Sequence, residues 1–119
     1  MTKKRAKTLS RLTSSVEVDP AFAPVVDAFA TQRDVTYGGK GFGSAALKVN
    51  DKIFAMMSSK RQFVVKLPRD RVEHLARLGQ GEYFDPGQGR LMKEWLVSAA
   101  TARWVELARE AYRFVKDGA

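Results

Sequence analysis

Hydrophobic and polar residues alternate in three short segments near the middle of the chain, at 45–49, 52–57 and 62–67. Such alternation sends successive side chains to opposite faces of a β-strand, so each segment is a predicted strand. The segments are separated by Asn50-Asp51 and by Ser59-Lys60, and both pairs suit a two-residue hairpin turn. The sequence therefore predicts an antiparallel meander of three strands.

Two-residue turns also fix the predicted register of the meander. The first turn places Leu47 opposite Phe54, and the second places Phe54 opposite Val65 and Met56 opposite Phe63. One face then carries the predicted core residues, which are Ala45, Leu47, Val49, Phe54, Met56, Phe63, Val65 and Leu67. The other face carries Ala46, Lys48, Ile53, Ala55, Met57, Gln62, Val64 and Lys66.

Three further segments repeat apolar residues at the spacing of an amphipathic helix, at 20–31, 68–79 and 100–115. The first follows Asp19-Pro20, which is typical of a helix start, but Pro24 inside it predicts a bend or a later beginning. The second begins with a proline and stops at a glycine. Between the second and third helices, 82–90 predicts a brief strand with a turn, and 91–97 predicts another strand.

The chain has 119 residues, of which 45% are hydrophobic. This supplies one core, so we expect a single domain over 17–119, preceded by a disordered basic tail over 1–16. Cysteine is absent, which excludes disulfides and thiolate metal sites and favours the cytoplasm as compartment. The early apolar run at 21–30 is too short for a membrane span, and the basic start lacks the apolar run of an export signal.

The formal net charge is +8, and its distribution along the chain is uneven. Five of the 21 basic residues precede the first acidic residue, and they are Lys3, Lys4, Arg5, Lys7 and Arg11. The rest of the chain has 16 basic and 13 acidic residues, so the folded part is only mildly basic. Two interpretations of the tail stay open, which are attraction to nucleic acid and simple solvation of a terminal segment.

The glycine-rich segment at 37–43 does not match a nucleotide-binding loop. A phosphate loop requires Gly-Lys followed by Ser or Thr after four free positions, and the dinucleotide pattern also fails. We interpret this segment as the glycine-rich beginning of the sheet, where a positive φ or a close backbone approach is needed.

The titratable residues do not form a catalytic or metal-binding pattern. His74 is the only histidine, so it has neither a second His nor a Cys for a transition-metal site, and a nearby serine does not complete a triad. The carboxylate pairs nearest in sequence are Glu82 with Asp85 and Glu106 with Glu110. We attribute the first pair to a turn and the second to a solvated helix face. We therefore expect no enzyme activity, no cofactor and no metal.

Several motifs occur in the order that is typical of one protein family. They are Phe42-Gly43, Lys52-Ile-Phe-Ala55, Val64-Val-Lys-Leu-Pro68, Phe84-Asp-Pro-Gly-Gln-Gly-Arg-Leu-Met-Lys-Glu-Trp95 and Ala111-Tyr-Arg-Phe-Val115. Over 20–116 the chain resembles the TfoX N-terminal domain family, related in fold to YjbR-like proteins. The resemblance implies an α+β fold of two layers, with an antiparallel sheet and helices packed on one face in the order α-β(3)-α-β(2)-α, as in secretion chaperones. It implies regulation without catalysis.

The leading functional hypothesis is a regulatory or adaptor domain that binds another protein or its own copy. The second face of the meander motivates it, because its apolar residues exceed those of a plain solvated face, while its lysines are too polar for a core. The candidate contacts are Ile53, Ala55, Met57 and Val64.

The alternative hypothesis is a nucleic-acid-binding protein. Besides the five basic residues of the tail, its candidate contacts are Lys48, Lys66, Arg90 and Lys93. Arg90 and Lys93 lie close to Trp95 in sequence, and such mixtures of cations and aromatic rings can hold single-stranded nucleic acid. Phosphate binding weakens steeply with ionic strength, which separates the two hypotheses.

Overall fold

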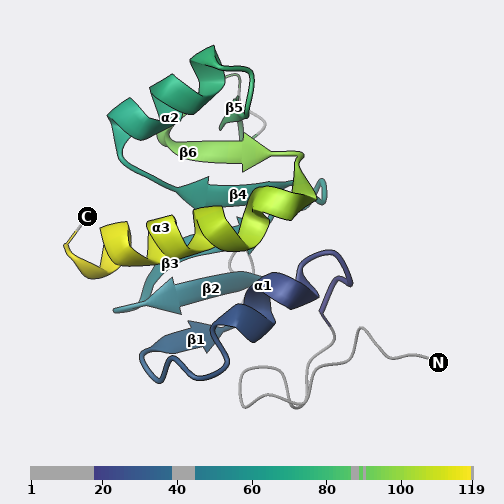
Figure 1. Cartoon of the computed structure of the whole chain (residues 1–119), viewed down its shortest axis with the longest axis vertical. Coiled ribbons are helices and arrows are strands. Elements are labelled where there is room, and N and C mark those ends of the chain that lie inside the picture. The colour runs from purple at the N-terminus through teal and green to yellow at the C-terminus, as the bar shows by residue number, and fades with distance from the viewer. Residues whose placement is uncertain (1–17, 39–44, 87–88, 90, 119) are drawn as a thin grey trace.

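Three helices pack on one face of a six-stranded antiparallel sheet (Figure 1), which confirms the predicted fold class. The computed structural model describes residues 18–38, 45–86, 89 and 91–118. The helices are α1 (Ala23–Ala28), α2 (Arg69–Arg77) and α3 (Trp104–Lys116), the last preceded by a 3₁₀ turn at Thr101–Arg103. The strands are β1 (Val35–Tyr37), β2 (Ala46–Val49), β3 (Lys52–Met57), β4 (Phe63–Lys66), β5 (Glu82–Phe84) and β6 (Met92–Ser98). Strand β1 precedes the predicted meander and was not predicted.

Helix α1 begins later than the start of its apolar pattern. The Asp19 carboxylate accepts a hydrogen bond from the backbone N–H of Ala21 at 3.0 Å and organises a turn before the helix. Pro24 then occupies the second helical position, where the chain needs no intrahelical N–H donor. The late beginning thus accommodates a proline that the interior of a helix would reject.

The first hairpin has the predicted turn, but its register changes at a β-bulge. Asn50 and Asp51 both adopt left-handed conformations, with φ of 54° and 63°, and Val49 pairs with Lys52. Leu47, however, lies opposite Ala55 rather than Phe54, because β3 contains one extra residue between the two pairs. The predicted pairing of Leu47 with Phe54 is therefore wrong.

The second hairpin has a three-residue loop instead of the predicted two. The backbone N–H groups of Arg61 and Ser58 donate to Ser58 O and Gln62 O, and Arg61 has a φ of 61°. This is a β-turn followed by one left-handed residue, which lengthens the loop. Met56 consequently lies opposite Val64 rather than Phe63, and Val65 lies opposite Ala55 rather than Phe54, so both predicted pairings of this hairpin are wrong.

The bulge and the longer loop exchange faces for three residues. Ala55 and Met57, which were predicted on the uncovered face, pack in the core beneath the helices. Met56, a predicted core residue of the helix side, packs on the opposite face instead. A shift of one residue moves a side chain to the other face, because successive side chains of a β-strand point to opposite faces of the sheet.

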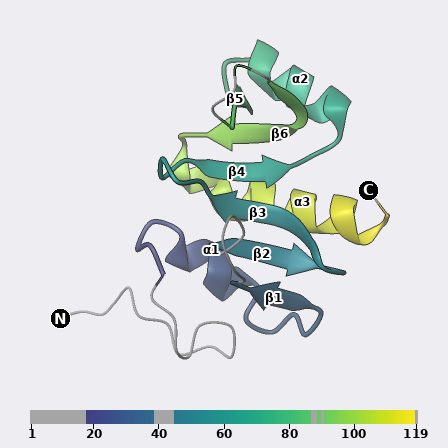
Figure 2. The same cartoon turned by 180° about the vertical axis from the view of Figure 1, so that it is seen from behind.

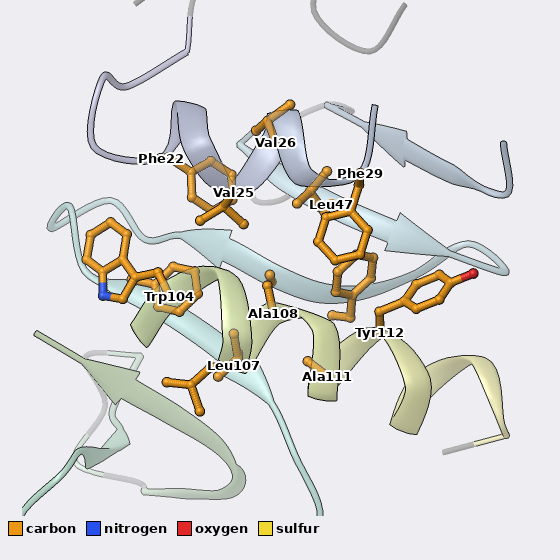
Figure 3. Close-up of a cluster of buried hydrophobic side chains, with 14 of the residues drawn as sticks. Phe22, Val25, Val26, Phe29, Leu47, Trp104, Leu107, Ala108, Ala111 and Tyr112 are labelled. Carbon is orange, nitrogen blue, oxygen red and sulfur yellow. The ribbon is translucent and has the colours of Figure 1, made fainter. Parts of the chain in front are cut away.

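The main core lies between the sheet and helices α1 and α3 (Figure 3). Figure 3 shows Val25 of α1, and Phe29, which follows the helix, directed toward the sheet and α3. The Phe29 ring lies 5.6 Å from that of Tyr112 of α3. Phe29 and Phe54 meet edge to face with ring centroids 5.1 Å apart, and Phe54 meets Tyr112 at 5.6 Å. Phe63 of β4 stacks on Trp104 at 4.6 Å with an interplanar angle of 11°.

Strand β6 enters the sheet between β4 and β5, which completes the order β1-β2-β3-β4-β6-β5. Helix α2 connects β4 to β5. It is followed by Gly79, whose φ of 74° is the left-handed conformation that often terminates a helix. Arg71 of α2 donates two hydrogen bonds to Glu110 of α3, each of 3.0 Å. This bidentate ion pair ties together the two helices that flank β4 and β6.

A polar cluster anchors the loop before β1 to the end of α3. The Asp34 carboxylate accepts hydrogen bonds from the Tyr112 hydroxyl at 2.9 and 3.0 Å and forms an ion pair of 3.0 Å with Lys116. These contacts, first that of Lys116 and then that of Tyr112, hold the pKa of Asp34 below its ordinary value. The stabilisation is present above the unfolded carboxyl pKa of about 4 and is lost as the pH falls through the lower folded value.

We therefore expect Asp34→Asn to lower the melting temperature at pH 7, where the wild-type carboxylate is charged. The difference between variant and wild type should shrink progressively as the pH falls below about 4. Thermal melts across this pH range measure it. Asp27→Asn is the matched control, because the exposed Asp27 side chain makes no ion pair with a described residue. A constant difference for Asp34→Asn at all pH values would contradict the assignment.

Candidate nucleic-acid interface

The surface of the sheet opposite the helices, which we call the outer face, is seen directly in Figure 2. No described helix covers it. The strand pairings align one row of side chains across it, and this row contains Ala46, Met56, Val64, Val97 and Glu82. Ala46, Met56 and Val64 are at most 2% exposed and, with Phe84, form a second apolar cluster. The centre of the outer face is therefore a small core rather than an exposed patch.

The next row of side chains along the strands is accessible to solvent and contains lysine and tryptophan. Lys48 pairs with Ile53 across β2 and β3, and Lys66 pairs with Trp95 across β4 and β6. All four side chains are only partly buried, whereas Ala46, Met56 and Val64 of the neighbouring row are at most 2% exposed. We call these four residues the lysine–tryptophan row. It places two ammonium groups and one indole on a helix-free surface.

Lys66 lies directly over the indole of this row. Its Nζ is 5.4 Å from the centroid of the Trp95 ring, within the range of a cation–π contact. The same Nζ lies 3.6 Å from a carboxylate oxygen of Glu94. Because Glu94 is half exposed, this ion pair is screened by solvent and contributes little stability. Lys66 is thus held near the ring, but only loosely.

A third lysine lies near these residues in sequence, at the beginning of β6. Lys93 lies two residues before Trp95 and is exposed, but the register of β6 against β5 shifts between Met92 and Leu96, so strand alternation does not fix the face on which Lys93 lies. Neither Lys93 nor Lys48 forms an ion pair with a described residue. Both charges are therefore available to an anionic partner.

The residues predicted to form a protein-binding patch are not brought together. Ile53 and Val64 lie on the outer face as predicted, but Ala55 and Met57 lie beneath the helices. Val64 is fully buried, which leaves Ile53 as the accessible member of the set. Whether any of them binds a partner stays a prediction.

The predicted nucleic-acid contacts include residues that the structure describes and residues that it does not. Lys48 and Lys66 share the outer face with Trp95, although they are far apart in sequence, and Lys93 is exposed at the beginning of β6. Arg90 and the five basic residues of the tail lie outside the described residues. Sequence reasoning linked Trp95 to Arg90 and Lys93 but not to Lys66, because the pairing of β4 with β6 joins segments separated by α2 and β5.

The described residues hold no candidate metal or catalytic cluster. Within them, no group of three or more His, Asp or Glu side chains is arranged to hold a metal ion. Glu106 and Glu110 are each paired with an arginine, at 3.0 Å in both cases, and His74 is exposed on α2. None of the helices in this part of the chain is long and apolar enough to span a membrane.

Comparisons with protein-family models, with curated proteins and with solved structures each found no match to this chain. Membership of the TfoX N-terminal domain family therefore stays a prediction from sequence motifs. Function has to be inferred from the arrangement of residues on the protein's own surface, above all on the outer face.

Proposed function

We propose that this protein is a non-enzymatic nucleic-acid-binding protein whose lysine–tryptophan row, together with Lys93, contacts a single strand. The observation that carries the proposal is the meeting of two lysines and one indole on the accessible part of a helix-free sheet face, with the exposed Lys93 two residues from the indole in sequence. The row crosses four strands, or three strand spacings, which amounts to about 14 Å. That length suits a few nucleotides of extended backbone.

The two residue types would serve different parts of the ligand. Lysine ammonium groups neutralise phosphates, which supplies affinity that does not depend on sequence. An aromatic ring on an open sheet stacks with an unpaired base, which is worth about 1–3 kcal/mol per base. Lys66 lies over Trp95 and would have to move from the ring when a base stacks there.

Single strands fit this surface better than a duplex does. Trp95 stacks only with bases that are unpaired and turned outward. A duplex binder that inserts a helix into the major groove usually presents a uniformly basic helix face. The exposed face of α3 instead mixes Arg109 and Arg113 with Glu106 and Asp117.

A second candidate function is the binding of a protein partner, as a regulatory or adaptor domain in the cytoplasm. One observation favours it, which is that Leu91 and Met92 are 56% and 37% exposed at the beginning of β6. They adjoin Lys93, so a partner with apolar and acidic groups would fit this end of the outer face. The proposed relation to the TfoX N-terminal domain family rests on the sequence motifs, and the observed order of elements differs from the implied α-β(3)-α-β(2)-α order by the additional strand β1.

Fluorescence anisotropy with a labelled oligothymidine of about 20 nucleotides tests the first proposal. For the variant Lys48→Gln/Lys66→Gln/Lys93→Gln, we expect the slope of log affinity against log salt concentration to flatten by about 2, at about 0.7 per phosphate contact. For Trp95→Leu, we expect about tenfold weaker binding with an unchanged slope, because stacking releases no counterions.

The matched control removes the same charge elsewhere. Lys60→Gln/Arg109→Gln/Arg113→Gln alters three exposed basic residues, none of which forms an ion pair with a described residue, in the β3–β4 turn and on α3. It should leave the salt slope closer to that of the wild type. Equal effects of the two triple variants would mean that only net charge matters. Loss of all binding after deletion of residues 2–16, with no effect of the outer-face variant, would assign the activity to the tail.

A further inference from the structure

A hollow of about 730 Å³ lies on the helix side of the sheet, between the end of α2 and the beginning of α3. We call it the α2–α3 hollow. Its apolar wall on the helix side contains Phe63, Ala76, Ala99 and Trp104, with Gly79 and Gly81 beside them, and its polar lining there contains Arg61, Gln62 and Ser98. Val97 and Glu82, which belong to the outer-face row, border the hollow from their strands. Its volume falls in the range of small-molecule sites, which is about 300–1,000 Å³. It lies on the opposite face of the sheet from the lysine–tryptophan row.

Ser98 gives this hollow an unused hydrogen-bonding group. Ser98 is 2% exposed, and its Oγ has no hydrogen-bond partner among the described residues, the only such buried side-chain atom there. An unpaired buried hydroxyl destabilises a fold, so a serine at this position needs a compensating role. The hydroxyl takes one of three staggered positions by rotation about a single bond, so it can turn toward a bound group.

The neighbouring polar groups are already engaged. The backbone oxygen of Ser98 accepts a hydrogen bond of 2.9 Å from the Trp104 indole nitrogen. Arg61 donates two hydrogen bonds, of 3.0 and 3.1 Å, to the Asp19 carboxylate. Its positive charge is thereby paired, and Glu82, the other ionisable residue that borders the hollow, belongs to the outer-face row. The hollow thus offers apolar and aromatic walls, little net charge and one free hydroxyl.

We propose that the α2–α3 hollow binds an uncharged, flat aromatic molecule whose polar group donates a hydrogen bond to the Ser98 hydroxyl or accepts one from it. The apolar body of such a ligand lies against the wall that includes Ala76 and Trp104, and its single polar group meets the hydroxyl. The hollow and the outer face are separate sites. A lack of ligand binding in the hollow would therefore leave the proposal of nucleic-acid binding untouched, and the reverse also holds.

Titration of the full chain with indole, followed by amide chemical shifts in NMR spectra, tests the proposal. We expect saturable shifts for Gly79, Gly81 and Ser98 with a Kd of about 1 mM. Tryptamine and indole-3-acetate carry the same ring with a positive and a negative charge, and both should bind no more tightly than indole. Tighter binding by either would overturn the assignment to an uncharged ligand.

Two variants test whether the hollow binds the ligand specifically or is only a depression in the surface. Ser98→Ala should raise the melting temperature, because it removes an unpaired hydroxyl, and should weaken indole binding about fivefold. Ala76→Leu should fill the hollow and abolish the shifts at Gly81 while the remaining spectrum stays folded. Indole binding that neither variant changes, or the absence of saturable shifts in the wild type, would overturn the proposal.

Discussion

Val64→Lys is expected to cost at least about 3 kcal/mol of unfolding free energy, a large part of the total stability of a small domain. Val64 is fully buried in the middle of the outer face, between Met56 and Val97 in the neighbouring strands. A lysine there buries an ammonium group without a partner and disturbs the packing of both neighbours. Urea unfolding followed by circular dichroism measures the change.

Ile53→Lys is the matched control, since it introduces the same side chain on the same face. Ile53 is only partly buried in the lysine–tryptophan row, so its ammonium group can reach water. We expect a loss of about 1 kcal/mol or less. If both variants lost equally little stability, the centre of the outer face would be an exposed patch, as the sequence first suggested, and not a second core.

Trp104→Ala is the second substitution with a large expected effect, about 3–5 kcal/mol of lost stability. The ring is 6% exposed and stacks on Phe63, and Figure 3 shows it at the start of α3, beside the α1 residue Val25. Removing it leaves a cavity where α1, α3 and the sheet meet. It also leaves the carbonyl oxygen of Ser98 without its indole donor.

Trp104→Phe separates these two contributions, because it keeps an aromatic ring against Phe63 but removes the indole N–H. We expect it to cost about 1–2 kcal/mol, from one lost hydrogen bond and a smaller ring. Denaturant unfolding of both variants compares them. A loss for Trp104→Ala no larger than that for Trp104→Phe would show that the stacking does not support the fold.

Local patterns were sufficient to predict most of the helices and strands. Asn50-Asp51 predicted the first hairpin turn correctly, because few residue pairs adopt two left-handed conformations. Pro68 and Gly79 delimited α2, and the apolar stripe through Ala108, Tyr112 and Val115 identified the buried side of α3. In each case, residues within a few positions of one another determine the structure.

The faces of the strands were harder to predict, because they depend on single-residue details of pairing. Ser59-Lys60 fits a two-residue turn equally well in sequence, yet Arg61 adopts a left-handed conformation and lengthens the loop. The bulge in β3 has no local sequence signal either. These two details moved Ala55 and Met57 out of the predicted patch and brought Met56 into the outer-face cluster.

The candidate site also depends on a pairing between distant segments. Lys66 and Trp95 meet only because β6 enters the sheet beside β4, after the chain has passed through α2 and β5. No periodicity in the sequence specifies that strand order. The sequence therefore supplied the lysines as separate candidates, and the topology placed Lys48 and Lys66 on one face.

Mapping an oligothymidine on the protein by NMR tests the central claim most directly, since it locates the contact rather than its strength. The lysine–tryptophan row predicts the largest amide shifts at Lys48, Ile53, Lys66 and Trp95, together with a shift of the Trp95 indole N–H. The Trp104 indole N–H, which is bonded to Ser98 O on the other side of the sheet, should stay unchanged. Shifts confined to residues 1–16, or centred on α3, would contradict the outer face as the nucleic-acid interface.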